Sequence, residues 1–388
     1  MTRGTTICCS ALALLTVLAP ASARPDSAAK ATEPWALAPV RMVWTLALTS
    51  HITLPPAVDD RRAYFPIEES RLVAYELETS KQAWLVEARP LQPPVADGQH
   101  LYIVEAEAVV ALGAEDGAVA WRSPVDEPVA VRPSAGGESL VVITKSGSVR
   151  VLRTADGALV WEHRLDAPPH APAAIADDRL YVPVEGRIIA LRLADGEPLW
   201  ERRVGGAPNE ILALPDRLYV GSTDNFLYCL MTRDGRIDWR WRTGADVSGL
   251  PAADAKRVYF VSFDNVLRVL DRVSGGQQWM RPLPLRPTSG PQLAGSTVVV
   301  AGQSAAIRTF AMKDGAPAPD IPTGDEVVAP PAVMLQPATG LPMIVVVTRN
   351  VARGDSVAVA VRSIEPAPTP VAPLPNAVTP APMPATRP

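Results

Sequence analysis

Tryptophan recurs along this chain with a period that few folds can accommodate. Seven of the nine tryptophans are spaced 37 to 40 residues apart, and they are Trp44, Trp84, Trp121, Trp161, Trp200, Trp239 and Trp279. Self-similarity at a period of roughly 20 to 50 residues is typical of solenoids and propellers, in which each repeat is one supersecondary unit. The 388 residues are therefore expected to form one repetitive architecture rather than several unrelated domains.

A turn lies four residues before most of these tryptophans. Ser80 fills the turn before Trp84, and glycine fills it in the next repeats, at Gly117, Gly157, Gly196, Gly235 and Gly275. Four of these glycines follow an aspartate, and Asp-Gly between two apolar runs is a strong hairpin signal because glycine readily adopts positive φ. Each repeat is therefore expected to contain a hairpin whose second strand carries the tryptophan.

The remainder of each repeat has the composition of further short strands. Segments such as 101–104 and 258–261 are rich in β-branched and aromatic residues, and 188–191 follows one such strand after a short loop. A Pro/Ala segment such as 172–174 precedes each unit, and we interpret it as the innermost strand, where small residues are needed near an axis. Four antiparallel strands in about 40 residues describe one blade of a β-propeller.

Eight repeats can be counted from the tyrosine-type strand, near positions 64, 102, 141, 181, 219, 259, 299 and 344. The seventh has Pro319 in place of its tryptophan, and the eighth ends after its third strand, at 357–362. The segment 42–47 has the tryptophan-strand pattern with no blade before it, so we expect it to complete the last blade and close the ring. The sequence thus predicts an all-β, eight-bladed propeller of four-stranded antiparallel blades over residues 41–365.

The tryptophans are expected to have a structural role. A wide ring on the outermost strand can reach the neighbouring blade, bury a large apolar area and donate its N–H to a backbone acceptor. A ligand cage is disfavoured, because regular spacing distributes the rings around the circumference. Blade seven, which lacks this contact, is expected to be the blade least protected in hydrogen exchange.

The two ends of the chain differ in composition from the repeats. Residues 1–23 have a basic start, an apolar run too short to span a bilayer and a small-x-small end, which is typical of a signal peptide. Residues 24–40 are expected to be a linker, and 366–388 a Pro-rich disordered tail serving as a spacer or a recognition peptide. The protein is therefore expected to be periplasmic or secreted, with no transmembrane segment.

Charge limits the classes of partner. The formal net charge is −4, with 37 basic and 41 acidic residues well mixed, and nothing resembles the basic field that nucleic-acid binding requires. We expect a monomer that binds protein rather than nucleic acid.

The repeat resembles that of the pyrroloquinoline-quinone-like, tryptophan-docking propellers. In that family an Ala-Leu-Asp segment precedes a turn ending in glycine, with tryptophan four residues later; Ala74, Ala111 and Ala190 match the alanine and Asp271 matches the aspartate. The resemblance implies one of two uses. One is a quinoprotein dehydrogenase, and the other is a non-catalytic adaptor such as the propeller subunit of the outer-membrane β-barrel assembly machinery.

The residues that the resemblance would require for chemistry are not apparent. The dehydrogenases carry a vicinal disulfide and a calcium ion, whereas the vicinal pair here, Cys8 and Cys9, falls in the expected signal peptide. Cys229 stands at the alanine position of the repeat and is expected to be a small core residue. His163 and His170 lack zinc-ligand spacing. We expect no catalytic residues, no cofactor and no metal site, with a secreted quinoprotein-type oxidoreductase that binds pyrroloquinoline quinone as the alternative.

Loops that should share one rim lean acidic. The residues singled out as a partner-binding rim are Glu105, Glu107, Glu185, Asp224, Asn225, Asp264 and Asn265. The simple interpretation is solvated loops, and arginines behind the tryptophans, such as Arg122, Arg202 and Arg281, would protect exposed strand edges. The functional hypothesis is that the acidic rim receives a basic segment or a cation, and that the chain is a protein-binding scaffold in bacterial envelope or outer-membrane protein assembly.

Overall fold

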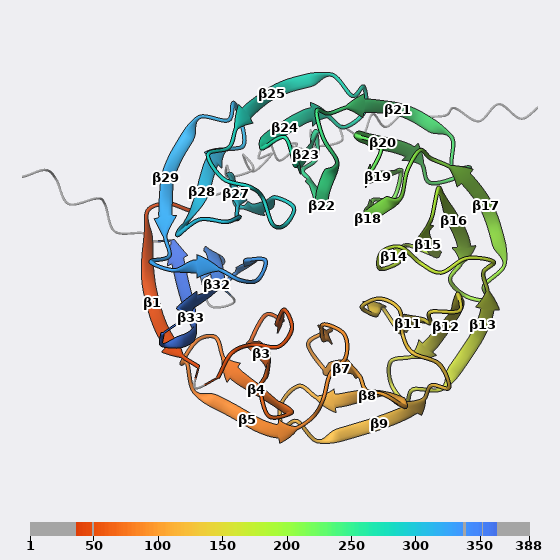
Figure 1. Cartoon of the computed structure of the whole chain (residues 1–388), viewed down its shortest axis with the longest axis horizontal. Helices are drawn as coiled ribbons and strands as arrows, with labels where there is room; N and C mark the ends of the chain where they lie inside the picture. The colour runs from red at the N-terminus through yellow and green to blue at the C-terminus, as the bar shows by residue number, and fades with distance from the viewer. Residues whose placement is uncertain (1–35, 49, 337–338, 351, 363–388) are drawn as a thin grey trace, which may run out of the picture. The chain divides into compact units, whose positions relative to one another are not determined.

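Eight small antiparallel sheets are arranged around a central opening (Figure 1). This arrangement is seen in a computed structural model that describes residues 36–48, 50–336, 339–350 and 352–362. Each sheet is a blade whose first strand lies beside the opening and whose last strand lies at the circumference. The predicted all-β, eight-bladed propeller is confirmed. Within the described residues there is no helix, and hence none long and apolar enough to cross a membrane.

The first four blades each contain four strands, paired in sequence order. Blade one contains β2 (Ala57–Val58), β3 (Arg62–Ile67), β4 (Arg71–Glu76) and β5 (Gln82–Glu87). Blade two contains β6 (Val95–Ala96), β7 (His100–Val104), β8 (Ala108–Gly113) and β9 (Val119–Pro124). Blade three contains β10 (Ser134–Gly136), β11 (Ser139–Ile143), β12 (Ser148–Arg153) and β13 (Leu159–Arg164). Blade four contains β14 (Ala174–Ala176), β15 (Arg179–Val184), β16 (Arg187–Arg192) and β17 (Pro198–Arg203).

The next three blades repeat this pattern with longer inner strands in blades five and six. Blade five contains β18 (Pro208–Ala213), β19 (Arg217–Ser222), β20 (Phe226–Met231) and β21 (Ile237–Arg242). Blade six contains β22 (Val247–Ala253), β23 (Arg257–Ser262), β24 (Val266–Asp271) and β25 (Gln277–Pro282). Blade seven contains β26 (Gln292–Ala294), β27 (Thr297–Val300), β28 (Ala306–Ala311) and β29 (Pro317–Pro322).

Blade eight is built from both ends of the described chain. It contains β30 (Glu326–Val327), β31 (Ala332–Leu335), β32 (Pro342–Asn350), β33 (Gly354–Arg362) and β1 (Val40–Ala47). Strand β1 pairs antiparallel with β33, as the sequence predicted for the closing strand. The blade has five strands rather than the predicted four, because β30 and β31 both pair with β32. Pro330 and Pro331 lie between them, and since proline has no N–H to donate, the innermost strand is split in two.

Consecutive blades are joined by the tryptophan of one blade and the hairpin turn of the next. At the joint between blades four and five, Gly235 has a φ of 65°, and a Cβ there would lie 2.4 Å from Cε3 of Trp200. The indole Nε1 of Trp200 donates a 2.8 Å hydrogen bond to the carbonyl oxygen of Thr232. Five other tryptophans make the equivalent bond: Trp44 to Leu77, Trp84 to Ala114, Trp121 to Thr154, Trp161 to Leu193 and Trp279 to Met312.

Trp239 is the exception to this pattern. Its Nε1 is buried and has no hydrogen-bond partner among the described residues. The carbonyl one repeat beyond that of Thr232 belongs to Arg272, and it accepts a 2.7 Å bond from the hydroxyl of Tyr219 instead. An unpaired buried donor costs about 1–3 kcal/mol, so this joint is packed like the others but lacks their polar bond.

The joint between blades seven and eight has no tryptophan, and residues of the expected linker occupy it. Leu37 is completely buried in an apolar cluster with Ile307 and Ile321 of blade seven and Ile344 of blade eight. Its backbone N–H donates to Oγ1 of Thr297 at 2.9 Å. The described part of the expected linker therefore packs against the propeller. The expected signal peptide and Pro-rich tail lie outside the described residues.

A buried carboxylate fastens the crossing from blade eight to blade one. The side chain of Asp355 is completely buried, and both of its oxygens accept bonds from Arg349, at 2.8 and 3.0 Å. Nδ1 of His51 lies 2.9 Å from Oδ1, and the backbone N–H of Ile52 donates to Oδ2 at 2.8 Å. Burial would raise the pKa of Asp355, but the bonds from Arg349, His51 and Ile52 outweigh burial, so its pKa is lowered. Asp355 thus links β33 directly to the chain that begins blade one.

Candidate functional site

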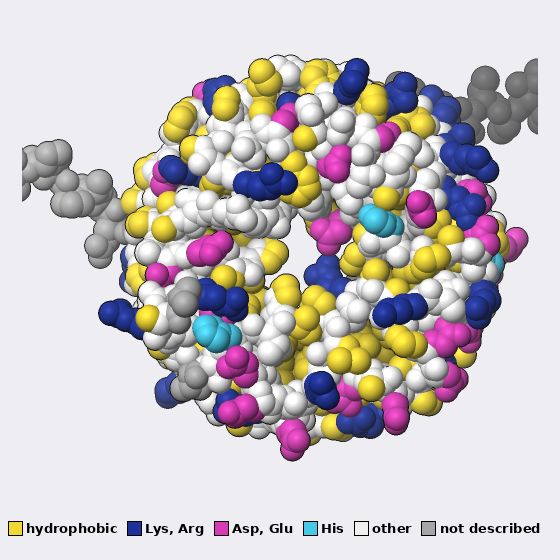
Figure 2. Space-filling model, in the orientation of Figure 1, with side chains coloured by type: hydrophobic (Ala, Val, Ile, Leu, Met, Phe, Trp, Pro, Cys, Tyr) yellow, Lys and Arg dark blue, Asp and Glu magenta, His cyan; other side chains and the backbone are white. Residues whose placement is uncertain are grey.

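Two sets of loops gather on one face of the ring, which we call the loop face. One set connects the second and third strands of each blade, and the other crosses from each outermost strand to the next blade. Contacts between the two sets confirm that they share a face, for example the 2.9 Å bond from Gly244 N–H in a crossing to Asp264 in a second–third loop. Figure 2 shows acidic and basic side chains interspersed around this face. All of the sequence-predicted rim residues lie on it.

Three glutamates of the rim lie over blades two and four. Glu105 pairs with Arg122 at 3.0 Å, whereas Glu107 and Glu185 are exposed and form no ion pair with any described residue. Glu105 and Glu107 line a cavity of about 550 Å³, together with Glu87, Arg89 and the exposed Leu91. This cavity brings carboxylates, guanidinium groups and an apolar side chain to one place on the surface.

Asp264 points into the protein rather than toward a partner. Arg268 donates to both of its oxygens, at 3.0 and 2.6 Å, and the hydroxyl of Ser262 donates to Oδ1 at 2.6 Å. Partial burial would raise the pKa of Asp264, but the bonds from Arg268, Ser262 and Gly244 N–H hold it at about 2. Its carboxylate is therefore ionised at neutral pH and committed to bonds within blade six and to the crossing that enters this blade from blade five.

Asp224 occupies the same position one repeat earlier and is also turned inward. The hydroxyl of Tyr228, which replaces Arg268 in this blade, donates to Oδ2 of Asp224, and the N–H of Gly205 donates to that hydroxyl at 3.1 Å. Oδ1 of Asp224 is buried without a hydrogen-bond partner among the described residues. Asp224 and Asp264 thus hold the loops of blades five and six in shape.

The two asparagines of the rim have a conformational role. Asn225 and Asn265 have φ values of 66° and 58°, the left-handed region in which asparagine is one of the few tolerated side chains. The N–H of Asn265 donates to the carbonyl of Ser262 at 3.0 Å, closing the turn. Ser-x-Asp-Asn therefore recurs in blades five and six as a turn sequence, with Asp and Asn each needed for the shape of the loop.

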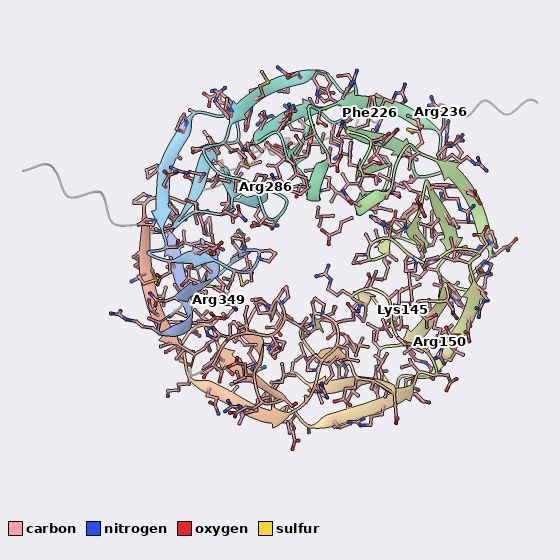
Figure 3. The ribbon with its side chains drawn as sticks, viewed as in Figure 1. Lys145, Arg150, Phe226, Arg236, Arg286 and Arg349 are labelled. Carbon is pink, nitrogen blue, oxygen red and sulfur yellow. The ribbon has the colours of Figure 1, made fainter. Side chains whose placement is uncertain are left out.

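Sequence reasoning missed two phenylalanine–arginine pairs next to these turns. The guanidinium carbon of Arg240 lies 4.9 Å from the ring centre of Phe226, and that of Arg286 lies 4.7 Å from the ring centre of Phe263. Figure 3 labels both residues in the upper part of the ring, Phe226 in blade five and Arg286 in the crossing from blade six to blade seven. Phe263 is 38% exposed, so part of its ring is open to the surface beside Arg286. The signal available in the sequence was aromatic residues beside the Ser-x-Asp-Asn turns.

The central opening has a mixed lining. A cavity of about 360 Å³ there is bounded by small side chains such as Ala135 and Ala174 and by the partly exposed Leu250. Arg132 and Glu210 approach each other to 3.8 Å at its edge. The small residues predicted for the innermost strands are thus found beside the axis.

The residues present do not fit the quinone apparatus of the dehydrogenases. Cys229 is the one cysteine within the described residues, and it is buried as a free thiol. Burial raises its pKa to about 12, so it is protonated at neutral pH. No group of three or more histidine, cysteine, aspartate or glutamate side chains among the described residues is placed to hold a metal ion.

Comparison with known proteins identifies relatives for most of the ring. Residues 86–215 and 214–329 match the sequence model of the family described as outer membrane protein assembly factor BamB. The outer membrane protein assembly factor BamB of Yersinia pestis is 28% identical over 145 residues, which are 32% of this chain and 37% of that protein. The match thus spans little more than a third of the length of this curated relative.

Solved structures show the same fold. BamB from Moraxella catarrhalis superposes with a TM-score of 0.65 at 20% identity, over 83% of this chain and 99% of that one. Quinohemoprotein alcohol dehydrogenase from Comamonas testosteroni superposes with a TM-score of 0.66 at 11% identity, over 85% of this chain and 78% of that one. At these identities both similarities concern the fold alone.

Proposed function

Because this chain belongs to the family of the outer membrane protein assembly factor BamB, we propose that it is a scaffold in outer-membrane protein assembly that holds a protein partner on its loop face. The family match over residues 86–215 and 214–329 is the observation that carries this proposal. A closed ring suits such a role, because it presents many loops on a rigid support.

The distribution of the rim residues supports the loop face as the binding surface. Glu107 and Glu185 are exposed and unpaired among the described residues, so they are available to a partner. The cavity beside Glu107 adds the exposed Leu91. Interfaces combine apolar contacts of this kind with a polar rim.

Export is part of the proposal. Residues 1–23 have the composition of a signal peptide, and a scaffold for outer-membrane proteins would act on the periplasmic side. We propose a periplasmic location on this basis.

The quinoprotein alternative has weaker support. The similarity to quinohemoprotein alcohol dehydrogenase is a similarity of fold at 11% identity, and a fold of this kind hosts unrelated functions. Adding pyrroloquinoline quinone and Ca²⁺ to the purified protein tests this alternative directly. Quinone-dependent oxidation of alcohols or sugars would favour the enzyme over the scaffold.

The proposed function is tested by deleting the gene and measuring folded outer-membrane β-barrel proteins by their heat-modifiable migration in gels. We expect their amount to fall and to be restored by the full chain. A variant lacking residues 1–23 is expected to be produced without restoring them, because it would not be exported. Unchanged levels of folded barrels after deletion would refute the assembly role.

A further inference from the structure

The exposed charges on the loop face are distributed unevenly. Around blades two to four the arginines are mostly paired: Arg122 with Glu105, Arg164 with Glu127, and Arg187 with Asp166 and Glu201. Around blades five and six the exposed arginines at the same face have no carboxylate within ion-pair distance among the described residues, and they are Arg240, Arg242 and Arg286. The second region therefore has guanidinium groups available to a partner.

The acidic residues of this second region do not offset these arginines at the surface. The carboxylate of Asp264 is committed to Arg268, Ser262 and Gly244, and that of Asp224 accepts from Tyr228. Asp246 is the remaining aspartate nearby, half-buried in the crossing that leads to β22. The exposed charge over blades five and six is therefore positive, although the loop sequences are acidic.

Two of these three arginines are held on aromatic rings. Arg240 lies over Phe226 and Arg286 over Phe263, each within 5 Å of the ring centre, at 4.9 and 4.7 Å respectively. Stacking restrains a guanidinium group while leaving its N–H groups free at the edge, and this fork matches a carboxylate in a bidentate geometry. Arginine and aromatic side chains are also the residue types that contribute most often to interface affinity.

We propose that the loop face over blades five and six binds an acidic segment of the protein partner, with carboxylates received by Arg240 and Arg286 on their phenylalanine supports. This inference rests on the proposed function, since it names the chemistry of the partner for the same face. It reverses the sign expected from the loop sequences, because the aspartates that make those loops acidic are turned inward.

The test measures binding of two fluorescent nonapeptides to the purified full-length protein by fluorescence anisotropy. One peptide is (Glu-Phe-Gly)₃ and the other is (Lys-Phe-Gly)₃. We expect the glutamate peptide to bind more tightly and to weaken as NaCl is raised, because charge pairing at a surface is screened. The double variant Arg240→Gln, Arg286→Gln should weaken its binding at least about tenfold, the scale expected for losing paired charges at an interface.

Two variants serve as matched controls. Lys145→Gln removes a cation from the loop face over blade three, and Arg236→Gln removes one from the hairpin turn of blade five (Figure 3). Both should bind the glutamate peptide as the unmodified protein does, and all variants should melt at similar temperatures. Tighter binding of the lysine peptide, no binding of either peptide, or unchanged binding by the double variant would overturn the inference.

Failure of this inference can be separated from failure of the assembly role. Suppose that deletion of the gene lowers the amount of folded barrel proteins, and that the double variant restores this amount fully and binds both peptides equally. The scaffold role is then supported, and the proposal that the partner segment is acidic is wrong. If deletion leaves the barrels unchanged, the assembly role itself is wrong.

Discussion

The joint between blades four and five and the joint between blades seven and eight solve the same packing problem in different ways. In the first, Trp200 covers the turn of the next blade, its indole N–H bonds to Thr232, and Arg202 donates to the carbonyl of Gly235 at 2.7 Å. In the second, Pro319 stands at the tryptophan position, and Leu37 from the other end of the chain is buried in the joint.

The difference shows that the tryptophan motif of one blade can form the joint only when the next blade supplies a matching turn. A tryptophan can dock on the next hairpin turn only if the next blade has such a turn. In blade eight the third strand is β33 and the fourth is β1, so the turn is replaced by two separate pieces of chain. Arg362 at the end of β33 donates to the carbonyls of Ala36 and Ala38, which joins these two pieces.

The largest loss of stability is expected from removing the tryptophan side chain at a joint between two blades. Trp121→Ala removes a side chain that is 7% exposed, together with its bond to Thr154, and should destabilise the ring by about 4 kcal/mol. Denaturant unfolding of the purified protein measures this. Val119→Ala on the same strand, where the side chain is 54% exposed, is the control and should change stability little. Equal effects of the two substitutions would contradict the role assigned to the joint.

The second-largest loss of stability is expected from breaking the contacts that join blade eight to blade one. Asp355→Asn leaves Arg349 and His51 without their buried carboxylate and should cost about 3 kcal/mol. Glu78→Gln, at an exposed position, is the charge-matched control.

The same residue predicts a dependence on pH. The pKa of Asp355 is lowered in the folded chain, so its carboxylate stabilises the fold above the unfolded-state pKa of about 3.9. That contribution is lost as the pH falls through the lower folded-state value. Melting curves should therefore show a smaller difference between the unmodified protein and Asp355→Asn near pH 3 than near pH 7. A difference that grows on acidification would contradict this sign.

Leu37→Ala sharpens the comparison at the joint that lacks tryptophan. It leaves a cavity among Ile307, Ile321 and Ile344 and should destabilise by about 2.5 kcal/mol. Met42→Ala, in the neighbouring β1 but 53% exposed, is the control. If Leu37→Ala and Met42→Ala lower the free energy of unfolding by equally small amounts in denaturant, the joint does not depend on Leu37.

Hydrogen exchange compares the joints without mutation. Blade seven is predicted to be the least protected blade, because a leucine fills less of a joint than an indole and makes no side-chain hydrogen bond. Amides of β28 should exchange roughly tenfold faster than those of β20, a difference of about 1.4 kcal/mol in opening free energy. Equal protection of the two strands would mean that Leu37 compensates fully for the missing tryptophan.

The smallest effect separates two tryptophans that pack alike. Trp200→Phe loses the bond to Thr232 as well as ring area, whereas Trp239→Phe loses ring area alone, because its Nε1 has no partner among the described residues. The first substitution should therefore cost about 1 kcal/mol more than the second. Melting temperatures of the two variants, measured side by side, test this. The reverse order would mean that Trp239 finds a partner in solution.

Much of the fold was predictable because its signals are local. Gly235 and its counterparts stand where a turn needs positive φ, and the tryptophans follow at a constant distance, so the hairpins and their period could be derived by counting. The split innermost strand of blade eight was missed, although Pro330 and Pro331 mark it. The burial of Leu37 could not be derived, since nothing near it in the sequence indicates which blade it contacts.

The candidate site was predicted in place but not in orientation. Residue type and position put Asp264 and Asp224 on the loop face, and they are there. Whether a carboxylate faces a partner or its own backbone depends on side chains brought near by folding, such as Arg268 and Tyr228. The same holds for Arg286, which reaches Phe263 from the crossing that follows blade six.

The sequence by itself therefore determined the repeat, the all-β architecture and the closing of the ring by its two ends, because strand period, turn chemistry and spacing are properties of short segments. The tertiary structure decided which residue fills the joint without a tryptophan, how Asp355 fastens the closure and which charges reach the surface of blades five and six. The first two depend on contacts between residues far apart in the chain, such as the 2.8 Å bond from Ile52 N–H to Asp355, which exist only once the ring has closed. The third depends on how side chains meet across a hairpin, as Asp264 and Arg268 do.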